Sequence, residues 1–126
     1  MAEVPLFVVD ATVAAKWHLK DEEFVEHADL IKQDHLDGKI QLMAPSHIYA
    51  EVGSSIRKAT LLRRLRFEQA LASIQDIPNW GVLLIHELLL PEALALSRRF
   101  SLSFHDSLYL ALAEDIGCPS STQTPR

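Results

Sequence analysis

Cysteine and glycine are both scarce in this chain, and each scarcity excludes a class of site. The single cysteine, Cys118, can form neither an internal disulfide nor a paired CxxC metal motif, which indicates a protein of a reducing compartment. The four glycines stand far from one another, so the glycine-rich loops that cradle nucleotide phosphates are missing. The six histidines include no HxxxH pair and have no cysteine partner, which argues against a zinc site.

Long apolar runs and an excess of basic charge are missing as well. Residues 81–90 form the longest apolar stretch near the middle, but it contains His86 and Glu87 and is far too short to cross a bilayer. Glu3 and Pro5 interrupt the amino terminus, so no signal peptide is predicted and we expect a cytoplasmic protein. The net charge of −5 argues against a protein that coats nucleic acid by neutralising phosphates. It does not exclude a nuclease, because a carboxylate site carries negative charge until cations bind.

The chain has the size and composition of one globular domain over residues 1–126, with 48% hydrophobic and 23% charged residues. Short β-branched or alternating runs predict strands at residues 6–9, 40–44 and 81–85. Helical spacing and capping residues predict helices between these strands and after them, at residues 11–17, 21–38, 46–59, 63–77, 92–100 and 106–116. Strands separated by helices predict an α/β fold with a short parallel sheet covered on both faces.

Details at the ends of these helices are predicted too. Asp21 to Glu23 supply acids for the first turn of their helix, where they suit its dipole. Ser46 is the expected N-cap of the third helix, and Pro78 with Asn79 is expected to end the fourth. Gly117 is the expected stop of the last one.

Three acidic residues lie at positions in this pattern that suggest a functional site. Asp10 ends the first apolar strand, at the edge where open α/β sheets bind their ligands. Glu51 lies within the apolar stripe of the third helix, and Asp106 stands at the start of the last helix. Burying an unpaired carboxylate is costly, so Glu51 needs a cation or a hydrogen-bonding partner. Three converging carboxylates predict a site for a hard divalent cation, Mg²⁺ or Mn²⁺.

Each acid taken alone has a structural explanation. Asp10 stands at a junction of strand and helix, where an aspartate commonly serves as an N-cap, and we weigh the two interpretations evenly. Glu51 has the alternative of a salt bridge to an arginine or lysine. For Asp106 alone, capping of the last helix is the favoured interpretation. The conjunction of the three favours the cation site.

Three segments carry a resemblance to a known family: VVDATVAAKW near the start, PSHIYAEVGSSIRKA in the middle and FHDSLYLALAEDIGCP near the end. They resemble the PIN-domain family, in particular the VapC-type toxins of toxin–antitoxin pairs. The resemblance implies a three-layer α/β/α domain that cuts RNA with Mg²⁺ or Mn²⁺, usually as a homodimer silenced by a cognate antitoxin. It implies that Asp10, Glu51 and Asp106 are the catalytic metal ligands, and that the hydroxyl of Thr12 supports the site.

The resemblance weakens after Pro119. Family members commonly continue with a strand ending in Thr-x-Asp, whose aspartate is a fourth acid, and then add a helix and a strand. Aligned on Thr122, this chain has Thr124 at the position of that aspartate, and its polar ending lacks the apolar run of a buried strand. We expect a truncated or frameshifted carboxyl end and weaker metal-dependent hydrolysis. The alternative function is a catalytically impaired PIN-like module that still dimerises and binds an antitoxin.

Basic and apolar surface residues suggest partners. The densest basic stretch and one further pair are expected either to steer an RNA backbone toward the acids or to be a solvated helical face, with equal weight. These residues are Arg57, Lys58, Arg63, Arg64, Arg66, Arg98 and Arg99. Exposed apolar residues between the helices predicted at 21–38 and 63–77 are a candidate groove for an antitoxin segment.

Overall fold

A computed structural model describes residues 4–117 and shows a parallel sheet in the middle of the molecule. In this part of the chain the strands are β1 (Leu6–Val8), β2 (Gln41–Pro45) and β3 (Leu83–Ile85), in the order β1-β2-β3. Leu6 pairs with Gln41 and Met43 with Leu83, all in parallel register. Parallel neighbours require crossover connections, and helices supply both of them here.

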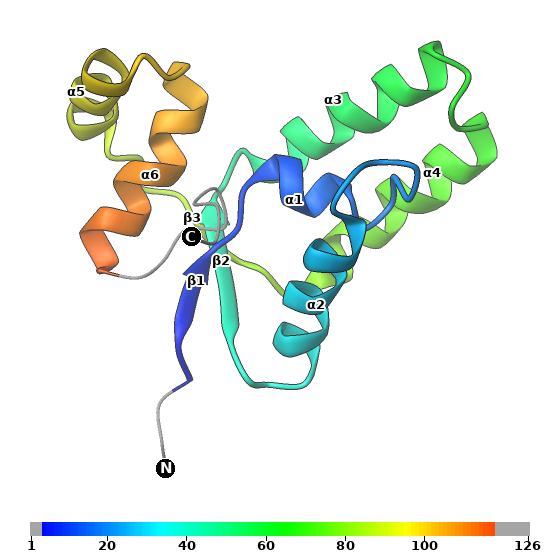
Figure 1. Ribbon diagram of the computed structural model, residues 1–126, viewed down its shortest axis with the longest axis horizontal. Helices are drawn as coiled ribbons and strands as arrows, with labels where there is room; N and C mark the ends of the chain where they lie inside the picture. Colours follow the sequence, from blue (N-terminus) through cyan, green and yellow to red (C-terminus); the bar gives the residue numbers. More distant parts are fainter. Residues whose placement is uncertain (1–3, 118–126) are drawn as a thin grey trace.

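Helices lie on both sides of the sheet. Figure 1 shows α5 and α6 on one side and α1 to α4 on the other. The helical elements are α1 (Ala11–Ala15), α2 (Val25–Leu36), α3 (Ile48–Leu61), α4 (Phe67–Asp76), the 3₁₀ helix η1 (Ile77–Trp80), α5 (Leu90–Phe100) and α6 (Phe104–Ile116). The predicted three-layer α/β/α fold is therefore confirmed. None of the helices within residues 4–117 is long and apolar enough to span a membrane.

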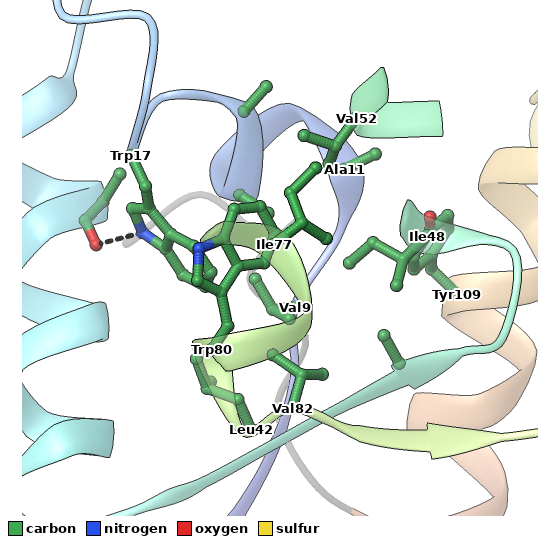
Figure 2. Packing of buried hydrophobic residues seen from close by; sticks show 14 of the residues in the cluster. Val9, Ala11, Trp17, Leu42, Ile48, Val52, Ile77, Trp80, Val82 and Tyr109 are labelled. Atoms are coloured by element: carbon green, nitrogen blue, oxygen red, sulfur yellow. Dashed lines mark hydrogen bonds between the residues drawn. The ribbon is translucent and has the colours of Figure 1, made fainter. Parts of the chain in front are cut away.

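The main core lies between the sheet, helices α1 to α4 and part of α6, which contributes Tyr109, Leu112 and Ala113. Trp17 and Trp80 meet edge to face with ring centroids 4.7 Å apart, and the indole N–H of Trp17 donates to the carbonyl of Ala28 at 2.9 Å (Figure 2). The predicted apolar stripe of α3 is buried along its length, at Ile48, Val52, Ile56 and Ala59. Burying one large aliphatic side chain contributes roughly 1.5–3 kcal/mol, so this stripe helps to fix α3 against its neighbours α1 and α4.

The start of α2 differs from the prediction. Asp21 and Glu22 precede the helix instead of forming its first turn, because Arg64 binds Asp21 through two hydrogen bonds of 2.8 Å and lies 3.5 Å from Glu22. Phe24 then takes a left-handed backbone conformation with φ of 61°, and the helix begins at Val25. A long-range ion pair thus overrides the local preference of these acids for a helix start.

Two other helix starts also differ. Ser46 is not the N-cap of α3: its backbone N–H donates to Ile85 at 2.9 Å, which extends the pairing of the sheet, and the helix begins at Ile48. Residues 63–66 are outside α4, because Arg63 has a left-handed φ of 58°. The Gln69 side chain accepts from the Arg66 N–H at 3.0 Å, and α4 begins at Phe67.

The remaining boundaries shift by smaller amounts. Pro78 and Asn79 continue the chain as η1, where the prediction had a break. Helices α5 and α6 each begin two residues before their predicted starts. Gly117 ends α6 as predicted, with a left-handed φ of 66° that glycine adopts without steric cost. The predicted departure from the family after Pro119, with Thr122 and Thr124, lies outside the described residues.

Candidate metal centre

Asp10 follows β1 directly and caps the helix after it. The Val9 N–H donates to Met43 at 3.0 Å, so backbone pairing reaches the residue before Asp10. The Asp10 Oδ1 atom accepts a hydrogen bond of 2.8 Å from the Val13 N–H, which makes Asp10 the N-cap of α1. The capping interpretation is confirmed for this residue. It does not exclude a second role, since a carboxylate has two oxygens and several acceptor positions.

Burial and like charges both act on the Asp10 carboxyl. Burial is the largest effect and raises its pKa above the usual value, while the Val13 N–H opposes this. The negative charges of Asp106 and Glu51 raise the pKa of Asp10 further. Three acids from α6, α3 and the end of β1 therefore lie near enough to repel one another. This repulsion is what a cation would relieve.

Glu51 lies in the first turn of α3, on the edge of its buried stripe, and is held through one oxygen. The Tyr109 hydroxyl donates to Glu51 Oε1 at 3.0 Å, and His47 Nε2 lies 2.6 Å from the same oxygen. Among residues 4–117, no ion pair joins Glu51 to an arginine or lysine, so the expected alternative of a salt bridge is replaced by a tyrosine and a histidine.

Asp106 occupies the first turn of α6 with an exposed side chain. The cap of this helix is Ser103, whose Oγ accepts a hydrogen bond of 3.1 Å from the Asp106 backbone N–H. The alternative interpretation of Asp106, that it caps the helix, is wrong, because the helix begins two residues earlier than expected and Ser103 is its N-cap. Its carboxylate still suits the positive end of the helix dipole.

The pKa of Tyr109 is also affected by the three acids. Burial is the main reason that the pKa of its hydroxyl is raised, followed by the charge and the hydrogen bond of Glu51. The charges of Asp10 and Asp106 add to this effect. One buried phenol therefore senses all three predicted acids.

The donor set fits a hard, hydrated cation better than a closed metal cage. Within residues 4–117, no group of three or more histidine, cysteine, aspartate or glutamate side chains stands ready to hold a metal ion. Mg²⁺ usually keeps several waters and binds proteins through few carboxylates, so it does not require such a cage. Oxygen donors that repel one another suit this ion and Mn²⁺. Ligation by Asp10, Glu51 and Asp106 stays a prediction.

Thr12 lies in α1, two residues after Asp10, with an exposed side chain. Its support of the site also stays a prediction. Two residues that the sequence reasoning missed, His47 and Tyr109, contact Glu51 directly, and their rings meet at 5.2 Å. Their spacing was the available signal, because His47 is four residues before Glu51 and Tyr109 three residues after Asp106.

The predicted basic stretch is divided by the fold. Arg64 is occupied by Asp21 and Glu22, whereas Arg57 and Lys58 are exposed on α3. From Glu51 to Leu61 the axis of α3 covers about 15 Å at the usual helical rise. The exposed basic residues therefore lie beyond the acids, toward the outer end of the α3–α4 hairpin (Figure 1).

Comparisons with known proteins identify the family and the fold of this chain. The family model of the PIN domain matches residues 7–122. Among solved structures, the chain is similar to Mycobacterium tuberculosis VapC20, described as a toxin that cleaves the sarcin–ricin loop. The two share 19% identity with a TM-score of 0.63, and the match covers 89% of this chain and 84% of that one. At this identity the similarity concerns the fold. A search of curated proteins gave no match.

Proposed function

The chain belongs to the PIN domain family, and from that premise we propose that it is a metal-dependent endoribonuclease of the VapC toxin type, acting in the cytoplasm. The observation that carries the proposal is the hydrogen bond of 3.0 Å from Tyr109 to Glu51 Oε1, which brings α3 to α6 one turn from Asp106. The raised pKa of Asp10, caused first by burial and then by the charges of Asp106 and Glu51, supports it. Three acids that are distant in the sequence therefore lie within electrostatic reach of one another. Asp10, the first of them, follows β1 at the edge where ligands bind in open α/β sheets.

Each of the three acids would hold the cation from a different side. Asp10, half-buried and fixed by its hydrogen bond to Val13, would hold a cation from the sheet side. Glu51 would hold it from α3, and the exposed carboxylate of Asp106 would hold it at the solvent side, where an RNA phosphate arrives. A bound Mg²⁺ or Mn²⁺ would supply an activated water and neutralise charge on the leaving oxygen. No side-chain nucleophile is required.

RNA is the proposed substrate, and exposed basic residues are its proposed guides. Arg57 and Lys58 on α3 and Arg66 before α4 are exposed. Such residues attract phosphates and set the position of the strand without reading its sequence. The described activity of VapC20 makes ribosomal RNA one substrate worth including in a test.

An antitoxin is the proposed protein partner, and a homodimer the proposed assembly. A groove of about 200 Å³ lies between α3 and α4, whereas the groove expected from the sequence was between α2 and α4. Phe67, Leu71 and Ile74 line it and are exposed, Phe67 to 70%. An apolar groove between helices suits an amphipathic helix of a partner.

A second candidate is a PIN-like module that binds its antitoxin but cleaves RNA poorly. Two observations favour it: the described residues contain no ready-made group of metal ligands, and the sequence has Thr124 where the family has an acid. This candidate predicts antitoxin binding with little or no cleavage.

RNA cleavage separates the two candidates. Purified protein is incubated with a mixed RNA pool that includes ribosomal RNA, in Mg²⁺, in Mn²⁺ and with EDTA. Metal-dependent cutting that Asp10→Asn abolishes supports the enzyme. Cutting that appears only in Thr124→Asp indicates a decayed site. No cutting in any form, together with antitoxin binding, favours the module.

A further inference from the structure

Two contacts from different parts of the chain determine the orientation of Glu51. Its Oε1 atom accepts the hydrogen bond of 3.0 Å from the Tyr109 hydroxyl and lies 2.6 Å from His47 Nε2. Both contacts use the same oxygen, and Oε2 takes part in neither. A half-exposed glutamate otherwise samples many rotamers, so two contacts from different parts of the chain restrict it strongly.

Tyr109 is a rigid support for this contact. Its side chain is 1% exposed, and its ring belongs to the core cluster beside the start of α3 (Figure 2). It lies one turn after Asp106 on the same face of α6. The hydrogen bond from Tyr109 to Glu51 therefore ties α3 to α6, and it sets the place of Glu51 relative to Asp106.

His47 completes the support from the other end of the site. It is the last residue before α3, and its ring lies between those of Tyr109, at 5.2 Å, and His105, at 5.5 Å. Its close approach to Glu51 Oε1 lacks the alignment of a good hydrogen bond. We read it as a contact that packs against the carboxylate and limits its rotation.

We propose that Tyr109 and His47 are positioning residues that hold Glu51 by Oε1 and leave Oε2 for the cation. The inference rests on the proposed function, because it concerns how this chain prepares one ligand of the metal site. Carboxylate ligands are themselves held by hydrogen bonds in metal sites, and loss of such a partner typically lowers metal affinity about 10–100-fold.

The test measures Mn²⁺ affinity in Tyr109→Phe, which removes the hydroxyl and keeps the ring. We expect the Mn²⁺ concentration that gives half of the maximal thermal stabilisation to rise about tenfold or more. The Mn²⁺ concentration for half-maximal RNA cleavage should rise in parallel, and saturating Mn²⁺ should restore most of the wild-type rate. A merely structural loss would lower the rate at every Mn²⁺ concentration.

Tyr49→Phe is the matched control. Tyr49 is the other tyrosine of the chain and lies on α3 with its ring 5.9 Å from that of Trp80. Removing its hydroxyl should leave Mn²⁺ affinity at the wild-type value. His47→Ala tests the second contact on Oε1 and should also weaken Mn²⁺ binding, while His47→Gln, which keeps side-chain volume beside the carboxylate, should recover part of the affinity.

Wild-type Mn²⁺ affinity in both Tyr109→Phe and His47→Ala, in a wild-type protein that binds Mn²⁺, overturns the positioning role alone. An equal loss in Tyr49→Phe overturns it too, because the effect would then not belong to the site. A wild-type protein that shows neither stabilisation nor cleavage with Mn²⁺ overturns the proposed function itself, so the two failures are distinguishable.

Discussion

Ser103 caps α6 by accepting the backbone N–H of Asp106 through its Oγ at 3.1 Å. The serine thereby takes over the role that a first-turn acid often fills, and the carboxylate of Asp106 is not used for the cap. At the other junction, Asp10 is itself the cap of α1. Asp10 is thus both a helix cap and a proposed metal ligand, whereas Asp106 is a proposed ligand only.

Ser103→Ala should therefore lower the stability of the fold, and Asp106→Asn should lower its affinity for Mn²⁺. Loss of the serine cap should cost about 1 kcal/mol of unfolding free energy and leave the cation affinity nearly unchanged. Asp106→Asn should change the unfolding free energy little and weaken Mn²⁺ binding. Urea denaturation and Mn²⁺ titration on both variants check this, and a large loss of Mn²⁺ affinity in Ser103→Ala would contradict it.

Two substitutions of Asp10 separate its role as a helix cap from the effect of its negative charge. Asn also caps helices, so Asp10→Asn keeps the acceptor for Val13 but removes a charge that folding disfavours. We expect this variant to be more stable than wild type without metal at pH 7, and to gain no stability from Mn²⁺. Asp10→Ala removes the same charge and also the cap, so it should be about 1 kcal/mol less stable than Asp10→Asn. Thermal melts with and without Mn²⁺ measure both, and a metal-free Asp10→Asn less stable than wild type would count against the repulsion.

Acid should destabilise the fold through His18. Burial lowers the pKa of this histidine below its usual value of 6.5, and the charge of Asp76, 3.0 Å away, only partly opposes this. The folded state therefore binds the proton less readily than the unfolded state. The contribution of neutral His18 is complete above pH 6.5 and is lost as the pH falls through that value toward the lower folded pKa. His18→Gln should lose less stability than wild type between pH 7.5 and about 5.5 in urea melts; an unchanged pH dependence would exclude His18 as the cause.

Exposed basic residues should contribute more to RNA binding than basic residues that already form an ion pair. Arg57 is exposed on α3, while Arg64 is held by two hydrogen bonds to Asp21. Arg57→Ala should weaken RNA binding in EDTA and reduce the dependence on salt by about one phosphate contact. Arg64→Ala should change that dependence less. Binding isotherms at several salt concentrations test this pair, and the reverse order would place the RNA path over Arg64.

The parts of the fold that the sequence predicted well are those set by local periodicity. The stripe from Ile48 to Ala59 is buried as expected, because spacing along the chain decides which side faces the core. The first apolar run is buried only at its end, at Val8 and Val9, while Leu6 at its start is exposed. The glycine stop at Gly117 likewise follows from backbone sterics alone. These features need no knowledge of distant residues.

The errors come from interactions between residues far apart in the chain. Asp21 and Arg64 are 43 residues apart, and their pairing moved the start of α2. Tyr109 and Glu51 are 58 residues apart, so the sequence could place Tyr109 one turn from Asp106 but could not show its hydrogen bond to Glu51. At Asp106 the error was local, since Ser103 and Asp106 are both good capping residues and only the register of the helix decides between them.

Direct measurement of Mn²⁺ binding tests the central claim that Asp10, Glu51 and Asp106 share a cation. The signal of free Mn²⁺ in electron paramagnetic resonance is followed as wild type, Asp10→Asn, Glu51→Gln and Asp106→Asn are titrated, with Glu68→Gln on the exposed side of α4 as the control. Our account predicts saturable binding in wild type and in the control, and weaker binding in each of the three site variants. Binding that none of the three substitutions weakens, or no binding by wild type, would contradict it.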